Sequence, residues 1–84
     1  MYLRFPGTET EATVYNALSP WLNPITDSYQ GAMGSVGTQE VVRLHRASST
    51  TIELYDNTNT KIKTIRSGNT TEIGENLAIC TVKY

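Results

Sequence analysis

The sequence predicts a small all-β protein, an antiparallel β-sandwich or barrel with an N-terminal arm and a loop-rich first third. Three observations support this prediction. Thirteen Thr, five Tyr, six Ile and five Val residues are present, and these types fit a pleated, half-buried surface better than a helix interior. All three prolines lie in the first 24 residues. From residue 40 onward, short alternating segments are separated by polar turns, a pattern typical of antiparallel sheets.

The length sets the domain organisation. With 84 residues the chain forms one domain, which we divide into an arm at residues 1–7 and a single β domain at residues 8–84. Domains of this size are marginally stable alone. Cys80 is the only cysteine and His45 the only histidine, so an internal disulfide is excluded and a structural zinc site lacks ligands. We therefore expect a homo-oligomer, specifically a trimer, to supply the missing support.

Charge and hydropathy exclude several partner classes. Seven basic residues stand against eight acidic ones, without the basic stripe of nucleic-acid binders, so we expect no nucleic-acid partner. No apolar segment approaches the roughly 18 residues of a membrane span, and the first residues lack the apolar region of a signal peptide. The expected place of synthesis is the cytoplasm of the producing cell, with export, if any, by assembly.

The first residues are expected to form the arm. Tyr2, Leu3 and Phe5 are apolar, and a Pro-Gly pair follows them. An arm of this kind either packs on its own domain or reaches a neighbouring molecule.

The next segment has two interpretations. Residues 10–17 alternate in polarity, which predicts a strand. The alternative is an amphipathic helix over residues 9–18, because Val14, Ala17 and Leu18 have helical spacing. The Thr-rich beginning favours the strand.

Residues 19–29 are expected to be a loop, because Pro20 and Pro24 restrict their preceding residues to extended geometry. Trp21 and Leu22 lie between the two prolines. The favoured position for Trp21 is a plug at the open end of the sandwich or barrel; the alternative is an exposed anchor in an interface. Residues 31–37 have glycine at every third position, which indicates close backbone approach or bulges in an edge strand.

The remaining residues predict the sheet. Five segments are expected as strands, at residues 40–46, 51–55, 61–66, 70–73 and 77–84, and three as turns, at residues 56–60, 67–69 and 74–76. Alternation places these apolar pairs on common faces: Val42 with Leu44, Ile52 with Leu54, and Leu77 with Ile79.

No complete catalytic, metal or nucleotide motif is present, so we expect neither enzymatic activity nor a cofactor. His45 shares a predicted strand face with Arg43, which could bind an anion, but no nucleophile lies near it in sequence. Cys80 lies in an apolar alternation and is expected in the core. The carboxylate pairs, Glu9 with Glu11 and Glu72 with Glu75, are expected to face solvent.

Residues 31–84 resemble a pattern of small bacteriophage structural proteins. The similarity begins at GAMGSV (residues 31–36), where such proteins have a glycine, a turn and an apolar strand. It is clearest in STTIELYDNT (residues 49–58), which is similar to a β-branched strand that enters an LYDNT-like turn. The segments KIKTI, ENLAI and TVKY that follow also fit. The Pro-rich first third departs from the pattern.

The resemblance implies a virion protein, most specifically a head decoration or cement protein on the capsid surface. Its implied partner is the major capsid protein or another virion protein. We expect the arm and the Trp loop to provide the contacts, through Met1, Tyr2, Leu3, Phe5, Trp21 and Leu22.

Two other functions are considered. The first is a carbohydrate or host-surface binding module of a phage fibre or tail, in which Tyr15, Trp21 and Tyr29 form an aromatic platform. The second is an enzyme that uses His45 with a carboxylate in a closed cleft.

Overall fold

The computed structural model describes the backbone of residues 2–80 and the side chains of residues 3–29 and 34–79. Within that part of the chain the elements are, in order, β1 (Tyr2–Phe5), α1 (Glu11–Leu18), a 3-10 turn (Ser19–Trp21), β2 (Ser28–Val36), β3 (Gln39–Ser48), β4 (Thr51–Tyr55), β5 (Lys61–Arg66) and β6 (Leu77–Cys80).

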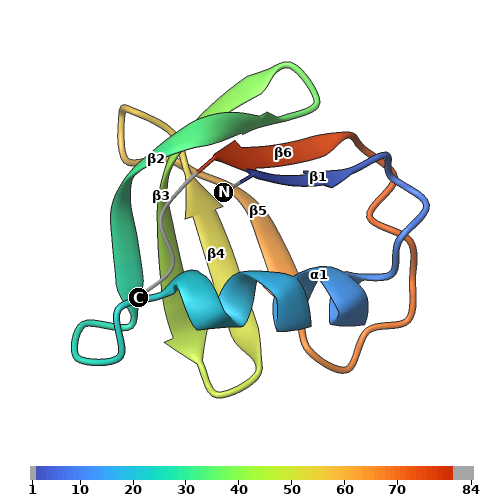
Figure 1. Cartoon of the computed structure of the whole chain (residues 1–84), viewed down its shortest axis with the longest axis horizontal. Coiled ribbons are helices and arrows are strands. Elements are labelled where there is room, and N and C mark those ends of the chain that lie inside the picture. The colour runs from blue at the N-terminus through green and yellow to red at the C-terminus, as the bar shows by residue number, and fades with distance from the viewer. Residues whose placement is uncertain (1, 81–84) are drawn as a thin grey trace.

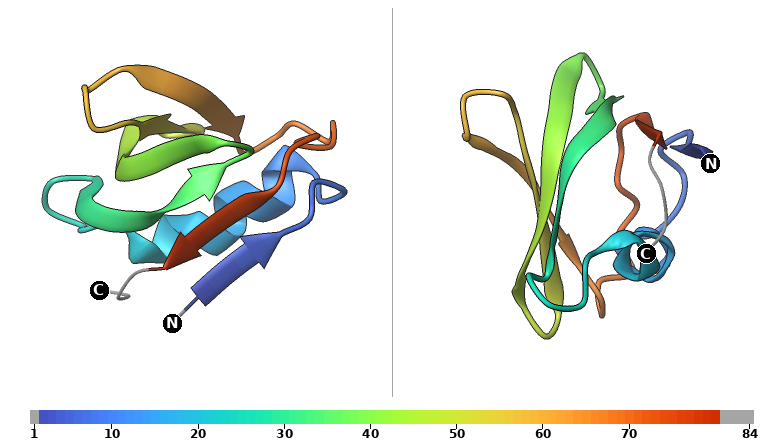
Figure 2. Two further views of the ribbon diagram at one scale, coloured as in Figure 1. Left: turned by 90° about the horizontal axis from the view of Figure 1, so that it is seen from above. Right: turned by 60° about the vertical axis from the view of Figure 1, so that its left-hand side comes forward.

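The six strands form one antiparallel sheet in the order β1-β6-β2-β3-β4-β5. The sheet curls so that β1 and β6 face the β3–β4–β5 part across the core, and α1 lies along the open side of the curl (Figures 1 and 2). The predicted all-β class is confirmed, with one short helix added to it.

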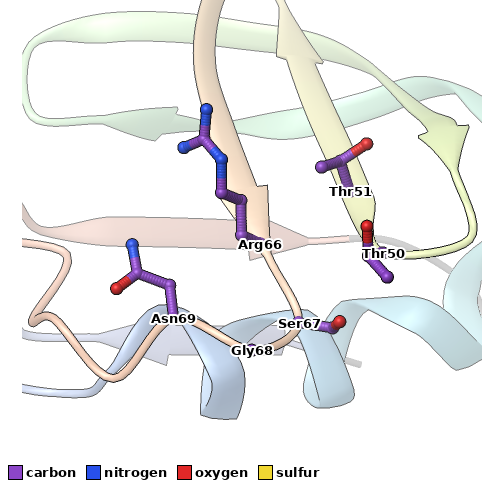
Figure 3. Close-up of a pocket in the computed structure, with 6 residues that line it drawn as sticks. All are labelled: Thr50, Thr51, Arg66, Ser67, Gly68 and Asn69. Carbon is purple, nitrogen blue, oxygen red and sulfur yellow. The ribbon is translucent and has the colours of Figure 1, made fainter.

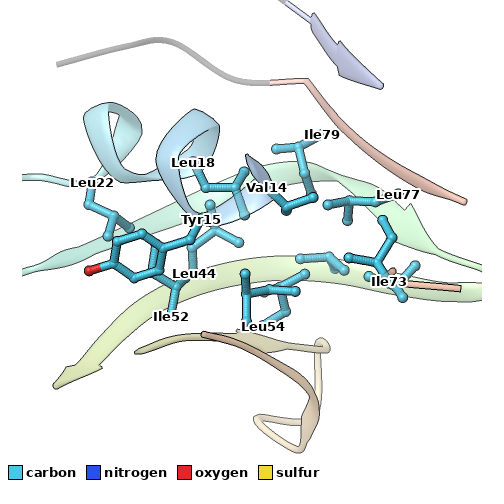
Figure 4. Packing of buried hydrophobic residues seen from close by; sticks show 13 residues of the cluster. Val14, Tyr15, Leu18, Leu22, Leu44, Ile52, Leu54, Ile73, Leu77 and Ile79 are labelled. Atoms are coloured by element: carbon cyan, nitrogen blue, oxygen red, sulfur yellow. The ribbon is translucent and has the colours of Figure 1, made fainter. Parts of the chain in front are cut away.

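The core lies between α1 and the concave face of the sheet (Figure 4). It is formed by side chains that are at most 7% exposed and come from the helix, the loop after it, the β5–β6 connection and all strands but β1: Val14, Tyr15, Leu18, Leu22, Val36, Val41, Leu44, Ile52, Leu54, Ile65, Ile73, Leu77 and Ile79. Burial of each of these large apolar side chains stabilises the fold by about 1.5–3 kcal/mol.

Residues of the expected arm form β1. This strand pairs with β6, with Leu3 opposite Ile79 and Phe5 opposite Leu77, and both Leu3 and Phe5 pack against the core. Of the two alternatives for the arm, the structure shows packing on its own domain. Met1 and residues 81–84 lie outside the described residues, as does the side chain of Cys80, so its expected core position is not described.

The strand predicted at residues 10–17 is wrong, and the helical alternative is correct. Thr10 is the N-cap of α1, where its hydroxyl accepts a hydrogen bond from the Thr13 N–H at 3.3 Å. Threonine is favourable at this position because it satisfies one of the otherwise unpaired donors of the first turn. Val14 and Leu18, one turn apart, then face the sheet and are fully buried.

The connections around α1 are joined by main-chain hydrogen bonds. Residues 7–12 run alongside residues 69–74, with bonds from Gly74 N–H to the Gly7 carbonyl (3.0 Å) and from Ala12 N–H to the Asn69 carbonyl (2.9 Å). The strand expected at residues 70–73 is therefore absent; an isolated bridge between Thr10 and Glu72 stands in its place.

The glycine-rich segment lies in β2, which is an interior strand and not the predicted edge strand, because β3 and β6 flank it. The close approach expected of these glycines is confirmed at Gly34, where an added Cβ would lie 2.0 Å from the Ala78 carbonyl oxygen. A bulge is also present, since the β2–β3 register shifts between Gln30 and Gly34.

The bulge changes which residues of β3 are buried. Val41 and Leu44 are both fully buried although they are three positions apart, and Val42 is only half-buried. The predicted sharing of one face by Val42 and Leu44 is therefore wrong. Burial does not alternate regularly along β3 because the β2–β3 pairing is interrupted where β2 has extra residues opposite β3.

The strands predicted at residues 40–46, 51–55 and 61–66 are confirmed, and so is the described part of the strand predicted at residues 77–84. β4 and β5 have the expected bounds, Ile52 and Leu54 are buried together, and so are Leu77 and Ile79. The turn after β4 is closed by a side chain, as described below.

Candidate binding surface

The residues expected to contact a partner lie mainly inside the domain. Trp21 is 2% exposed and Leu22 is 5% exposed, whereas Leu3 and Phe5 are half-buried against the core. Trp21 thus has the buried position favoured from the sequence, not the exposed one. Met1 and the side chain of Tyr2 lie outside the described residues.

The aromatic platform expected for carbohydrate binding is absent from the described side chains. Tyr15 is 7% exposed, and Tyr29 packs against the core. Because Tyr15, Trp21 and Tyr29 do not form an exposed face, this form of the carbohydrate hypothesis is wrong.

The convex face of β3, β4 and β5 carries a continuous group of polar side chains. The strand registers place on this face Arg43, His45, Thr51, Glu53, Tyr55, Lys61, Thr64 and Arg66. Three of these side chains are permanent cations and one is an anion. A chain whose total charge is −1 therefore concentrates positive charge on one face.

Arg43 and Tyr55 form the centre of this convex face. They are directly opposite each other in β3 and β4, and the guanidinium carbon of Arg43 lies 4.0 Å from the centroid of the Tyr55 ring. Stacking of this kind is a cation–π contact that holds both side chains in place. Arg43 Nη2 also donates to Asn59 Oδ1 at 2.8 Å.

Glu53 connects the Tyr55 ring to the neighbouring strand. Tyr55 Oη donates to Glu53 Oε1 at 2.5 Å, and Lys61 Nζ lies 3.4 Å from Glu53 Oε2. The pKa of Glu53 is lowered by the Tyr55 hydrogen bond and, to a lesser degree, by Lys61, against the opposing effect of burial. The same bond raises the pKa of Tyr55, since it favours the protonated phenol.

The turn after β4 positions Asn59 for its bond to Arg43. Asp56 Oδ1 accepts hydrogen bonds from Thr58 N–H and Thr60 N–H, each at 2.9 Å, and from the Thr58 hydroxyl at 2.7 Å. The pKa of Asp56 is lowered, first by the Thr58 hydroxyl and then by the Thr60 N–H. Asn59 adopts a φ of 64°, which Asn tolerates better than most residues.

His45 lies directly opposite Glu53 on this face. The carboxylate of Glu53 is already engaged by Tyr55 and Lys61, so the pair is part of a surface network. The sequence correctly placed Arg43 and His45 on one face but gave no sign of the Tyr55 stack, which depends on the β3–β4 register.

A second polar cluster, which sequence reasoning missed, surrounds Arg46 at the end of β3. Its guanidinium donates to Tyr15 Oη and, at 2.6 Å, to Ser19 Oγ, and it lies 3.6 Å from an Asp27 carboxylate oxygen. Tyr15 Oη in turn donates to the Ser49 carbonyl at 3.0 Å. The cluster ties α1 and the Pro-rich loop to the sheet, and we assign it a structural role.

The carboxylates also differ from expectation. Glu11 is 9% exposed, and its Oε1 accepts the Arg66 N–H at 3.0 Å, so the expectation that Glu9 and Glu11 both face solvent is wrong. Glu72 and Glu75 are exposed as expected. Among the described residues no group of three or more His, Cys, Asp or Glu side chains could hold a metal ion, and no helix in that part is long and apolar enough to cross a membrane.

No protein-family model matches this chain, and no curated protein or solved structure shows significant similarity to it. The resemblance to phage structural proteins therefore rests on the residues of this sequence alone.

Proposed function

We propose that this chain is a non-enzymatic structural protein of a bacteriophage virion, which docks on an acidic patch of a larger virion protein through the convex face of β3–β4–β5. The virion assignment rests on the sequence resemblance. We assign docking to the convex face because the Arg43–Tyr55 stack lies at its centre.

The composition of this face suits protein binding. Arg and Tyr are among the residues that contribute most to interfaces, and Arg43 and Tyr55 are held in position by Asn59 and Glu53. Held side chains lose less conformational entropy on binding than mobile ones. The excess of cations over anions on the face favours an acidic partner surface and fast association with it.

The docking face replaces the contacts expected from the sequence. Trp21 and Leu22 are almost fully covered by the domain itself, so they cannot reach a partner unless the loop rearranges. Lys61 is exposed, and Arg43 and Tyr55 are partly exposed, without any rearrangement.

Self-association is the second part of the proposal. A trimer would present three copies of a weak docking face to a repetitive shell, and linked weak contacts give strong total attachment. Light scattering of the purified protein should give three times the mass of the 9.3 kDa chain. A monomeric mass would contradict the trimer without affecting the docking face.

The virion assignment is tested on purified particles of the producing phage. We expect peptides of this chain by mass spectrometry and antibody labelling on the particle surface. Absence of the chain from pure, infectious particles would contradict the assignment.

The docking face is tested by adding purified variants to particles that lack the chain. Arg43→Ala and Tyr55→Ala should each weaken binding about tenfold or more, as for central interface residues. Arg4→Ala is the matched control, because it removes the same charge from β1 at the other end of the sheet. Equal binding by all three variants would exclude the convex face as the docking site.

A further inference from the structure

A surface pocket of about 440 Å³ lies where the β3–β4 turn meets the turn that follows β5, and it is lined by Thr50, Thr51, Arg66, Ser67, Gly68 and Asn69. Figure 3 shows Arg66 between Asn69 on one side and the two threonines on the other. Five of the six lining residues carry a polar side chain, and the sixth is a glycine.

Arg66 differs from the other cations of the described chain. Arg43, Arg46, Lys61 and Lys63 each have a hydrogen-bonding or ionic partner, and Arg4 also has an interaction. In residues 2–80 only the guanidinium of Arg66 makes neither an ion pair nor a hydrogen bond, and the residue is exposed. Its planar array of donors matches the oxygens of carboxylate, phosphate or sulfate.

Other hydrogen-bonding side chains line the same pocket. Asn69 Oδ1 accepts a hydrogen bond from the Thr71 N–H at 3.0 Å. The Asn69 amide nitrogen extends from the turn in the same direction as the Arg66 side chain (Figure 3). The hydroxyl of Thr50 and that of Thr51 both contact Ser48 Oγ, at 3.4 Å and 2.8 Å. Hydroxyl groups both donate and accept, so they suit a ligand that carries hydroxyls of its own.

The pocket is built on a fixed backbone. The Ser67 N–H donates to the Thr50 carbonyl at 2.8 Å, and the Ala12 N–H donates to the Asn69 carbonyl at 2.9 Å. Glu11 Oε1 accepts a hydrogen bond from the main-chain N–H of Arg66, and Glu11 forms no ion pair with the Arg66 guanidinium. The main chain of the lining residues therefore keeps its shape without a ligand, which lowers the entropic cost of binding.

We propose that this pocket binds the phosphate, sulfate or carboxylate group of an acidic sugar. Arg66 holds the oxyanion, Asn69 adds a neutral donor, and Thr50, Thr51 and Ser67 contact the hydroxyls of the sugar. The pocket shares Thr51 and Arg66 with the end of the convex face but does not include Arg43 or Tyr55, so the inference holds whether or not the convex face docks on a virion protein.

The test is a titration of the whole protein, followed by the amide signals in two-dimensional NMR at constant ionic strength. The ligands are glucose 6-phosphate, glucuronate, inorganic phosphate and, as the neutral control, glucose. We expect saturable shifts of the Thr50, Ser67, Gly68 and Asn69 signals with either acidic sugar, weaker binding of inorganic phosphate, and none of glucose.

Two variants test whether Arg66 is responsible for binding the acidic sugar. Arg66→Gln should weaken the binding of glucose 6-phosphate about tenfold or more, since a charge-assisted hydrogen bond contributes such a factor. Lys61→Gln is the matched control, because it removes one charge from the same face outside the pocket, and should change binding by less than roughly twofold at moderate salt. Both variants alter exposed residues, and dispersed spectra would show that they are folded.

Three results would overturn the inference. No saturable shift with any of the anions would exclude the site. Equal losses in Arg66→Gln and Lys61→Gln would show non-specific attraction to the face. Inorganic phosphate that binds as tightly as glucose 6-phosphate would exclude the sugar as the ligand.

Discussion

The carboxylate of Glu11, at the first turn of α1, accepts the main-chain N–H of Arg66 at the end of β5, at a distance of 3.0 Å across 55 positions of sequence. Glu11 is thus a buried carboxylate with a hydrogen-bonding partner. It accepts a hydrogen bond from the end of β5, an edge strand of the sheet, and connects the helix to the sheet. Such a donor on an edge strand would otherwise be available to another chain.

Glu11→Ala should lower the free energy of unfolding by about 1.5–3 kcal/mol, the range for a hydrogen bond to a charged group. Urea unfolding of the variant measures this loss. Glu72→Ala serves as control, because Glu72 is exposed and its removal should change stability by less than about 0.5 kcal/mol. A loss no larger than that of the control would show that the Glu11 bond does not stabilise the fold.

Arg46→Ala should destabilise the protein by about 2 kcal/mol, because it removes donors to Tyr15 and Ser19 and leaves the Asp27 carboxylate without its partner. Arg43→Ala, on the same strand but on the convex face, should cost less than about 1 kcal/mol, as expected of an exposed cation–π contact. Thermal unfolding of the two variants compares the costs. Equal losses would contradict the structural role assigned to the Arg46 cluster.

Gly34→Ala should prevent folding or destabilise the protein by more than about 3 kcal/mol, since the added Cβ would lie 2.0 Å from the Ala78 carbonyl oxygen. Gly68→Ala is the matched substitution, because a Cβ there meets nothing within 4 Å. It should be neutral or stabilising by up to about 1 kcal/mol. Circular dichroism and urea unfolding distinguish the two outcomes. A folded, stable Gly34→Ala protein would mean that β2 and β6 do not approach as closely as described.

Acidification should weaken the convex face through Glu53. Its pKa in the folded protein is lowered from the ordinary value of 4.5, chiefly by the Tyr55 hydroxyl. A lowered folded-state pKa contributes stability above the unfolded-state value, and that contribution is lost as the pH falls from there through the folded-state pKa. Glu53→Gln should therefore be less sensitive than the unmodified protein to a pH decrease below 4.5.

Unfolding measured from pH 7 downward tests this expectation. The difference in stability between the two proteins should be constant at neutral pH and should shrink in acid. A difference in stability that does not change with pH would show that the Tyr55 hydrogen bond does not stabilise the ionised Glu53 carboxylate in the folded state.

Several elements could be predicted because their signals are local. The turn of residues 56–60 depends on the Asp56 side chain bonding to its own neighbours, and β4 alternates buried and partly exposed side chains as a strand with one buried face does. The helix was mispredicted because Thr10 is a cap residue, and a capping Thr and a strand Thr cannot be distinguished by composition.

The candidate sites depend on contacts between distant segments. Arg43 meets Tyr55 only through the β3–β4 register, and Arg66 joins Thr50 and Thr51 only because β4 and β5 pair and the following turn closes beside them. Neither arrangement has a local signature, since single Arg, Thr and Tyr residues are common on the surfaces of strands.

The sequence by itself determined the all-β class, most strand positions and the polar turns, because side-chain alternation and turn chemistry act over a few residues. Only the tertiary structure decided that β2 is interior, that Glu11 binds the end of β5 and that Arg43, Lys61 and Arg66 lie on one face. These features arise from strand order, register and the curl of the sheet, which depend on how well the whole core packs rather than on any single segment.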